Sequence, residues 1–80
     1  MKLWRISQKV NNDYDSYDSA IVAAVSKKDA KAIHPNGSAC EENATDFYCW
    51  CALSDVEVEY IGVAAKSIKR GVILASFNAG

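Results

Sequence analysis

The chain has 80 residues, of which 50% are hydrophobic and 24% charged, and its formal net charge at pH 7 is −1. This length allows one domain, spanning residues 1–80, and excludes two separate cores. The composition excludes intrinsic disorder. The near-neutral charge argues against a dedicated nucleic-acid-binding protein, which usually carries a basic excess. Because so small a core gives only marginal stability, a homodimer is a possibility.

Targeting and membrane signals are absent from the sequence. The N-terminal residues lack the apolar core of a signal peptide, and no apolar run approaches the roughly 18 residues that cross a membrane. The three cysteines are an odd number, whereas a small secreted protein usually pairs an even set. We therefore expect a reduced, cytoplasmic protein that has no contact with a membrane.

The first predicted strand covers residues 3–7, with Trp4 and Ile6 on one face. Residues 11–18 are rich in Asn and Asp, which compete locally for backbone hydrogen bonds, so we expect a polar loop there. Residues 19–25 are apolar on both faces, a pattern that fits either a central strand or the start of a helix.

The residues that follow favour the strand. Ser26-Lys27-Lys28-Asp29 has the form of a capping box, in which Ser26 covers the first helical turn and Asp29 reaches back. We therefore predict a strand over 20–25 and a short helix over 27–34, with Ala30 and Ile33 facing the core. Pro35 ends that helix, and we expect an exposed loop over residues 36–47.

In the C-terminal half, residues 47–53 are apolar and aromatic and could form a short edge strand. Residues 56–60 alternate strictly, which predicts a half-buried strand with Val56, Val58 and Tyr60 facing inward. A turn or a single helical turn over residues 64–69 leads to an apolar run over 72–77, which we place at the centre of the sheet. The predicted fold class is α+β: about four mostly antiparallel strands in the order ββαββ, with one short helix on one face.

Four residues have side chains that could bind zinc, namely His34, Cys40, Cys49 and Cys51. Their spacing is poor, because only Cys49 and Cys51 are close, with one residue between them. The simpler interpretation is that these two cysteines are small buried residues and that Cys40 is a loop thiol. We predict no metal site and no cofactor.

Catalytic residues are not predicted either. Nucleophilic catalysis needs a Cys or Ser beside a positioned base, and the one histidine, His34, is better explained as a cap for helix carbonyls. The sequence lacks a glycine-rich phosphate loop, and Asp13, Asp15 and Asp18 do not have calcium-loop spacing. We expect a protein that is not an enzyme.

The candidate contact surface is the polar loop, where two Tyr-Asp pairs follow one another: Tyr14-Asp15 and Tyr17-Asp18. Tyrosine offers a large amphipathic surface at low entropic cost, and the carboxylates add charge. We predict that Tyr14, Asp15, Tyr17 and Asp18 bind a partner. The structural alternative is that the polar residues only cap turns and that one tyrosine folds onto the sheet.

Charge is segregated along the chain. Acidic residues dominate 13–18 and 41–59, and basic residues gather in two segments, Lys27, Lys28 and Lys31 in the first and Lys66, Lys69 and Arg70 in the second. Such a distribution fits a polar protein–protein contact better than a DNA groove.

Three blocks of the sequence, ISQKVNNDYDSYDSAIVAA, AKAIHPNG and DVEVEYIGVAAKSIKRGVILASFNAG, resemble a family of short proteins encoded by phages, prophages and some bacteria, to which no reaction is assigned. The cysteine-bearing residues 38–52 depart from the family pattern. The resemblance implies a bacterial cytoplasmic setting and a phage-accessory role. By analogy with other small phage proteins, it suggests binding to a bacterial host protein.

The leading functional hypothesis is therefore a protein-binding module, which could inhibit a host defence complex in the manner of an anti-CRISPR protein. The alternative is a metal-stapled or nucleic-acid-associated regulatory protein.

Overall fold

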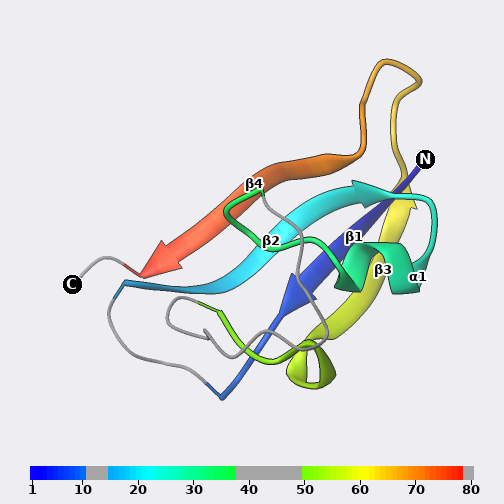
Figure 1. The fold of residues 1–80 in the computed structure, drawn as a ribbon. Coiled ribbons are helices and arrows are strands. Elements are labelled where there is room, and N and C mark those ends of the chain that lie inside the picture. Colours follow the sequence, from blue (N-terminus) through cyan, green and yellow to red (C-terminus); the bar gives the residue numbers. More distant parts are fainter. Residues whose placement is uncertain (11–14, 38–49, 79–80) are drawn as a thin grey trace.

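The computed structural model describes residues 1–10, 15–37 and 50–78. Four strands form one antiparallel sheet, and their spatial order is β3-β1-β2-β4 (Figure 1). They are β1 (Lys2–Ser7), β2 (Ser16–Ala24), β3 (Glu57–Val63) and β4 (Gly71–Asn78). A short helix, α1 (Lys27–Lys31), follows β2, and a single 3₁₀ turn (Leu53–Asp55) precedes β3. The predicted α+β class and the ββαββ order are confirmed.

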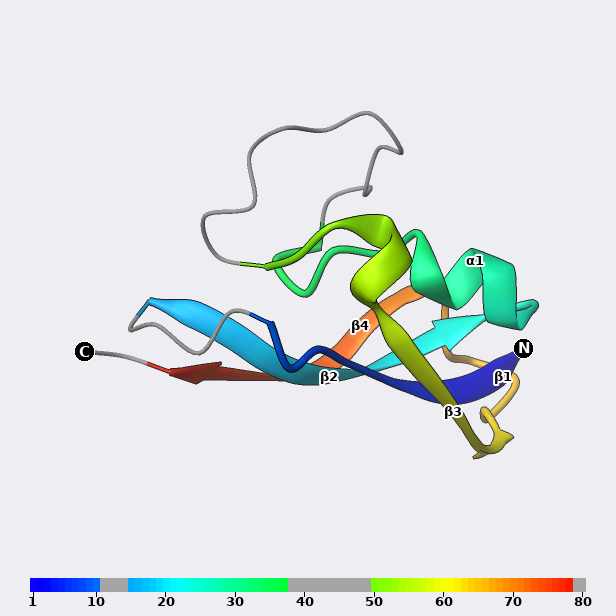
Figure 2. The same cartoon turned by 90° about the horizontal axis from the view of Figure 1, so that it is seen from below.

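The hydrophobic core lies on one face of this sheet. Alternate side chains of a strand point to the same face, so Trp4 and Ile6 of β1 lie beside Ala20, Val22 and Ala24 of β2. Figure 2 shows α1 and the 3₁₀ turn above this face. The covering segments add further buried side chains to the core: Ala30, Ile33, Trp50, Cys51 and Val56.

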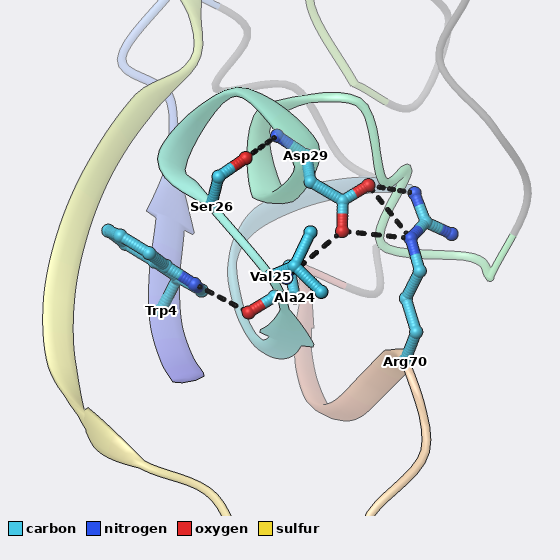
Figure 3. A network of polar contacts seen from close by, with 6 residues as sticks. All are labelled: Trp4, Ala24, Val25, Ser26, Asp29 and Arg70. Atoms are coloured by element: carbon cyan, nitrogen blue, oxygen red, sulfur yellow. Dashed lines mark hydrogen bonds and ion pairs between the residues drawn. The ribbon is translucent and has the colours of Figure 1, made fainter. Parts of the chain in front are cut away.

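The start of α1 follows the predicted capping box in part. The Asp29 backbone N–H donates to the Ser26 hydroxyl at 3.1 Å, and the Asp29 carboxylate accepts from the Val25 N–H at 3.1 Å (Figure 3). The first bond satisfies a donor of the first helical turn that has no partner within the helix. The second reaches the residue before the N-cap, whereas the side chain in a standard capping box accepts from the N–H of the N-cap residue itself. Beside them, the Trp4 indole N–H donates to the Ala24 carbonyl at 3.1 Å, which holds β1 to the end of β2.

The helix ends at Lys31 rather than at residue 34. The N–H groups of Ala32 and Ile33 donate to carbonyls three residues earlier, which is the 3₁₀ pattern that tightens a last turn. Pro35 disfavours the helical conformation at the residue before it, so the chain has little room for another turn. Ala30 and Ile33 still face the core as predicted.

The structure corrects three strand predictions. β2 begins at Ser16, so residues 16–18 belong to the sheet rather than to a loop. The run over 72–77 lies in β4, which is an edge strand, whereas β1 and β2 are central. The predicted edge strand over 47–53 is not seen at Trp50 and Cys51, which lie outside any strand. The rest of that prediction up to residue 49, and most of the loop predicted over 36–47, fall on residues 38–49, which lie outside the described residues.

The reason for the error over 72–77 is a β-bulge. The register between β2 and β4 shifts between Ile21 and Val22, which leaves Ile73 as an extra residue. Ile73 and Leu74 are consequently both exposed, although consecutive apolar residues suggest a strand that is buried on both faces. Neither helical segment of the described residues is long and apolar enough to cross a membrane.

Candidate protein-binding surface

Antiparallel pairing brings four strand ends together at one end of the sheet, which we call the hairpin end. β1 ends there at Ser7 and β2 begins there at Ser16, while β3 begins at Glu57 and β4 ends at Asn78. The start of α1 and the connection over residues 64–70 lie at the opposite end (Figure 1).

Charge is distributed unevenly between these two ends. Asp15, Asp18 and Glu57 are exposed at the hairpin end, where Lys9 lies 3.8 Å from a Glu57 carboxylate oxygen. At the opposite end, Arg70 contacts Asp29 of α1. That contact unites the two basic segments of the sequence, whose exposed members include Lys27, Lys28, Lys66 and Lys69.

Tyr17 lies in β2, not in a loop, and its half-buried ring packs against the core. Its centroid is 4.8 Å from that of Phe77 on β4 and 6.0 Å from that of His34. Such tilted and edge-on contacts are favourable arrangements of aromatic rings. Tyr17 therefore folds onto the sheet, as the structural alternative anticipates, and Phe77, which is 47% exposed, is the more accessible ring of the pair.

The carboxylates on either side of Tyr17 are both exposed. Asp15 has a φ of 62°, in the left-handed region that Asp and Asn tolerate better than most residues. Asp18 is the extra residue of a bulge, because Tyr17 pairs with Phe77 and Ser19 pairs with Ser76. Bulges re-aim side chains at sheet edges. Tyr14, the fourth predicted contact residue, lies outside the described residues.

We use the name hairpin surface for Asp15, Tyr17, Asp18 and Phe77. It joins two exposed carboxylates to an aromatic pair that is fixed on paired strands. Three of these residues are among the predicted contact residues, whereas Phe77 is not, because its apolar strand suggests the centre of the sheet.

Gln8, which is not among the residues predicted from the sequence, makes hydrogen bonds to two residues of this surface. The residue is 4% exposed; its side-chain amide nitrogen donates to the Tyr17 carbonyl at 2.9 Å, and its amide oxygen accepts from the Val10 N–H at 2.8 Å. The Gln8 backbone N–H also donates to the Asp18 carbonyl at 3.2 Å. The alternation of β1 could have predicted the burial of Gln8, because Gln8 falls on the inward face of the strand with Trp4 and Ile6.

The position of His34 bears on the zinc hypothesis. Its Nδ1 accepts a hydrogen bond from the Asn36 backbone N–H at 3.0 Å, and its ring lies 6.2 Å from that of Trp50. Nδ1 of His34 therefore accepts from a backbone N–H instead of acting on a helix carbonyl, and its lone pair is already in use. Cys51 is buried, and Cys40 and Cys49 lie outside the described residues. Within residues 1–10, 15–37 and 50–78, His, Cys, Asp and Glu do not form a group of three or more that could hold a metal ion.

The sequence matches no protein-family model, and no curated protein or solved structure is significantly similar to the chain. The resemblance to phage-encoded proteins therefore stays a prediction, and the site has to be judged by its own chemistry.

Proposed function

We propose that this chain is a non-enzymatic protein-binding module whose hairpin surface contacts a positively charged region of another protein. The observation that carries the proposal is that two exposed residues, Asp15 and Asp18, lie on either side of Tyr17 in the chain and that the Tyr17 ring packs against Phe77. Aromatic side chains supply contact area at interfaces, and complementary charge supplies association rate and specificity.

The rigidity of the support favours binding as well. Tyr17 packs on the core, and Gln8 fixes the carbonyl of Tyr17. A surface that is already ordered loses little conformational entropy when a partner binds. Disordered loops lack this advantage because ordering them reduces affinity.

We further propose that the partner is a bacterial host protein in the cytoplasm, and that binding inhibits a host defence complex in the manner of an anti-CRISPR protein. The sequence resemblance supports this finer proposal. The step from small phage protein to inhibitor is an analogy between proteins of similar size and origin.

Capture from a bacterial lysate tests the binding role. The wild-type chain is compared with the double variant Asp15→Asn and Asp18→Asn, which removes two charges and keeps a residue that tolerates positive φ at position 15. The matched control is Glu57→Gln with Glu59→Gln, an equal change of charge on β3. We expect the wild type and the control to capture the same protein in stoichiometric amount, and the Asp15/Asp18 variant to lose it. Equal capture by all three would refute the proposed surface.

A plaque assay tests the finer proposal. Bacteria with an active CRISPR system and a matching spacer are infected while they express the chain. Inhibition predicts that plaques return with the wild type and with the Glu57/Glu59 control but not with the Asp15/Asp18 variant. Failure of plaques to return, together with intact capture, would contradict inhibition of that system and leave the binding role standing.

The gathering of basic side chains at the opposite end favours a second candidate function, a nucleic-acid-associated regulator. Lys27, Lys28, Lys66 and Lys69 are exposed there, whereas Arg70 is paired with Asp29. Contacts between lysine and phosphate make affinity fall steeply with salt. Titration of generic duplex DNA at several salt concentrations separates the two functions, since the leading proposal predicts no measurable DNA binding at physiological salt.

A further inference from the structure

In the described part of the chain, β4 is an edge strand whose protection against further pairing is limited to the bulge at Ile73. Within the described part of the chain it pairs only with β2 (Figure 1). Its sequence, GVILASFN, contains no charged residue and no proline, the two residue classes that most often block an exposed sheet edge. Three of its side chains are large, apolar and substantially exposed: Ile73 at 47%, Leu74 at 69% and Phe77 at 47%.

The opposite edge, β3, is protected in the ordinary way. It carries Glu57 and Glu59 and has its own bulge, since Trp4 pairs with Tyr60 while Leu3 pairs with Gly62. Like charges on facing strands are destabilising, so a second copy of β3 would be repelled. A second copy of β4 would meet no such repulsion. The charge pattern thus separates the two edges and favours β4 as the one that accepts another copy of the chain.

We propose that β4 pairs antiparallel with β4 of a second copy, around a two-fold axis at Ser76, to give a homodimer with one continuous eight-stranded sheet. The register follows from the bulge at Ile73, which leaves Leu74 to Asn78 as the regular part of the strand. Ser76 is the middle residue of that part. Each Phe77 then lies opposite Ala75 of the partner subunit, where a small side chain leaves room for the ring. This proposal does not rest on the proposed function.

Antiparallel association turns the two hairpin ends in opposite directions. Because Ser76 pairs with Ser19, the axis lies level with the start of β2, and the Asp18 bulges of the two copies flank it, each one strand away from β4. This proximity of like charges weakens the association. The contact is a single short strand pair, well below the roughly 800 Å² per partner of a standard interface. We therefore expect a micromolar dissociation constant rather than an obligate dimer.

Charge reversal at the axis tests the register. Ser76 is exposed, so Ser76→Asp and Ser76→Lys should both fold. A residue on the axis faces its own copy. Each variant alone should therefore self-associate about fivefold more weakly or worse, as like charges in facing positions predict. An equimolar mixture should recover or exceed the wild-type association through Asp–Lys pairs. Sedimentation equilibrium gives the two self-association constants, and anisotropy of a dye-labelled Ser76→Asp chain titrated with Ser76→Lys gives the mixed one.

The matched control places the same charges on the other edge, as Val63→Asp and Val63→Lys, at a side chain that is 75% exposed on β3. These variants should self-associate like the wild type. Hydrogen exchange supplies a second measurement: β4 amides should exchange more slowly at high protein concentration, and β3 amides should not change. A wild type that stays monomeric at several hundred micromolar would overturn the proposal. So would a dimer without extra β4 protection, or Ser76 variants that are not rescued by mixing.

Discussion

Arg70 and Asp29 are 41 residues apart in the chain, yet the guanidinium Nε of Arg70 lies 2.9 and 3.0 Å from the two carboxylate oxygens of Asp29 (Figure 3). A terminal nitrogen, Nη2, lies 2.8 Å from Oδ1. The pair joins the residue before β4 to the first turn of α1. The hydrogen bonds from Arg70 lower the pKa of Asp29, and those same bonds raise the pKa of Arg70.

The first prediction concerns the pH dependence of this ion pair. Because the pKa of Asp29 is lower in the folded state, the pair stabilises the fold above the unfolded-state pKa of about 4. That contribution disappears as the pH falls through the folded-state value. The Arg70 side chain is 48% exposed, so we expect a contribution below about 1 kcal/mol. Urea melts should show Asp29→Asn less stable than wild type at pH 7, with the difference vanishing near pH 2. A difference that does not change with pH would contradict the assignment.

The second prediction concerns Gln8. Gln8→Ala leaves the Tyr17 carbonyl and the Val10 N–H without their side-chain partner, and groups orphaned in this way cost about 1–3 kcal/mol. Urea denaturation gives the loss of stability. The neighbouring exposed change, Lys9→Ala, is the control and should stay within about 0.5 kcal/mol of wild type. If Gln8→Ala were as stable as Lys9→Ala, the two hydrogen bonds would have no structural role.

We expect that substitution of Tyr17 lowers the stability of the fold directly, and that any loss of partner binding follows from this destabilisation. Tyr17→Ala removes a half-buried ring that contacts Phe77 and His34, and we expect a loss of roughly 1–2 kcal/mol, below the 3–5 kcal/mol typical of a fully buried aromatic. Tyr17→Phe, which keeps the ring, should melt like wild type. Thermal melts of the three proteins measure this loss. An unchanged melting temperature for Tyr17→Ala would contradict the packing of the Tyr17 ring on the core and favour the predicted exposed loop.

A charge on the inward face of β3 should unfold much of the protein. Val58 pairs with Ile6, which is fully buried, and it packs against the core. Val58→Asp should cost several kcal/mol, a large share of the roughly 4–12 kcal/mol that 0.05–0.15 kcal/mol per residue allows an 80-residue domain. Glu59→Gln, one position along on the other face, is the control. A cooperative, native-like melt of Val58→Asp by circular dichroism would show that the face is assigned wrongly.

Removal of metal should leave the fold unchanged. His34 already uses Nδ1 to accept from the Asn36 N–H, and the four candidate ligands are poorly spaced. Thermal melts with and without a strong chelator should coincide. A drop of many degrees, together with about one zinc per chain by elemental analysis, would demonstrate a structural metal site.

The sequence was sufficient for those parts of the fold that depend on local signals. The Ser26–Asp29 pattern located α1, and the alternation around Val58 gave the correct inward face at that residue, whereas Tyr60, which was also predicted to face inward, is 53% exposed. The order of the strands depends on which β-strands pair, and no local pattern encodes that. The apolar run of β4 therefore looked central, because a bulge that exposes two consecutive apolar residues has the same sequence pattern as a buried strand.

The candidate site was predictable only in part. Asp15 and Asp18 were recognisable from the composition of the loop. Phe77 reaches the same surface through pairing with Tyr17, which is 60 positions earlier in the chain, and its contribution requires knowledge of the topology. The union of the two basic segments through Arg70 and Asp29 is a long-range contact of the same kind.

Among the described residues, acidic side chains gather at one end of the sheet and basic side chains at the other, which gives this part of the molecule an electric dipole moment along its strands, although the net charge of the chain is only −1. In the field of a positively charged partner, a dipole experiences a torque that turns the hairpin end forward before any contact forms. Orientation of this kind accelerates association and leaves dissociation unaffected. Its range is about 10 Å at 0.1 M salt, so the rate of encounter should fall with ionic strength while the lifetime of the complex stays constant.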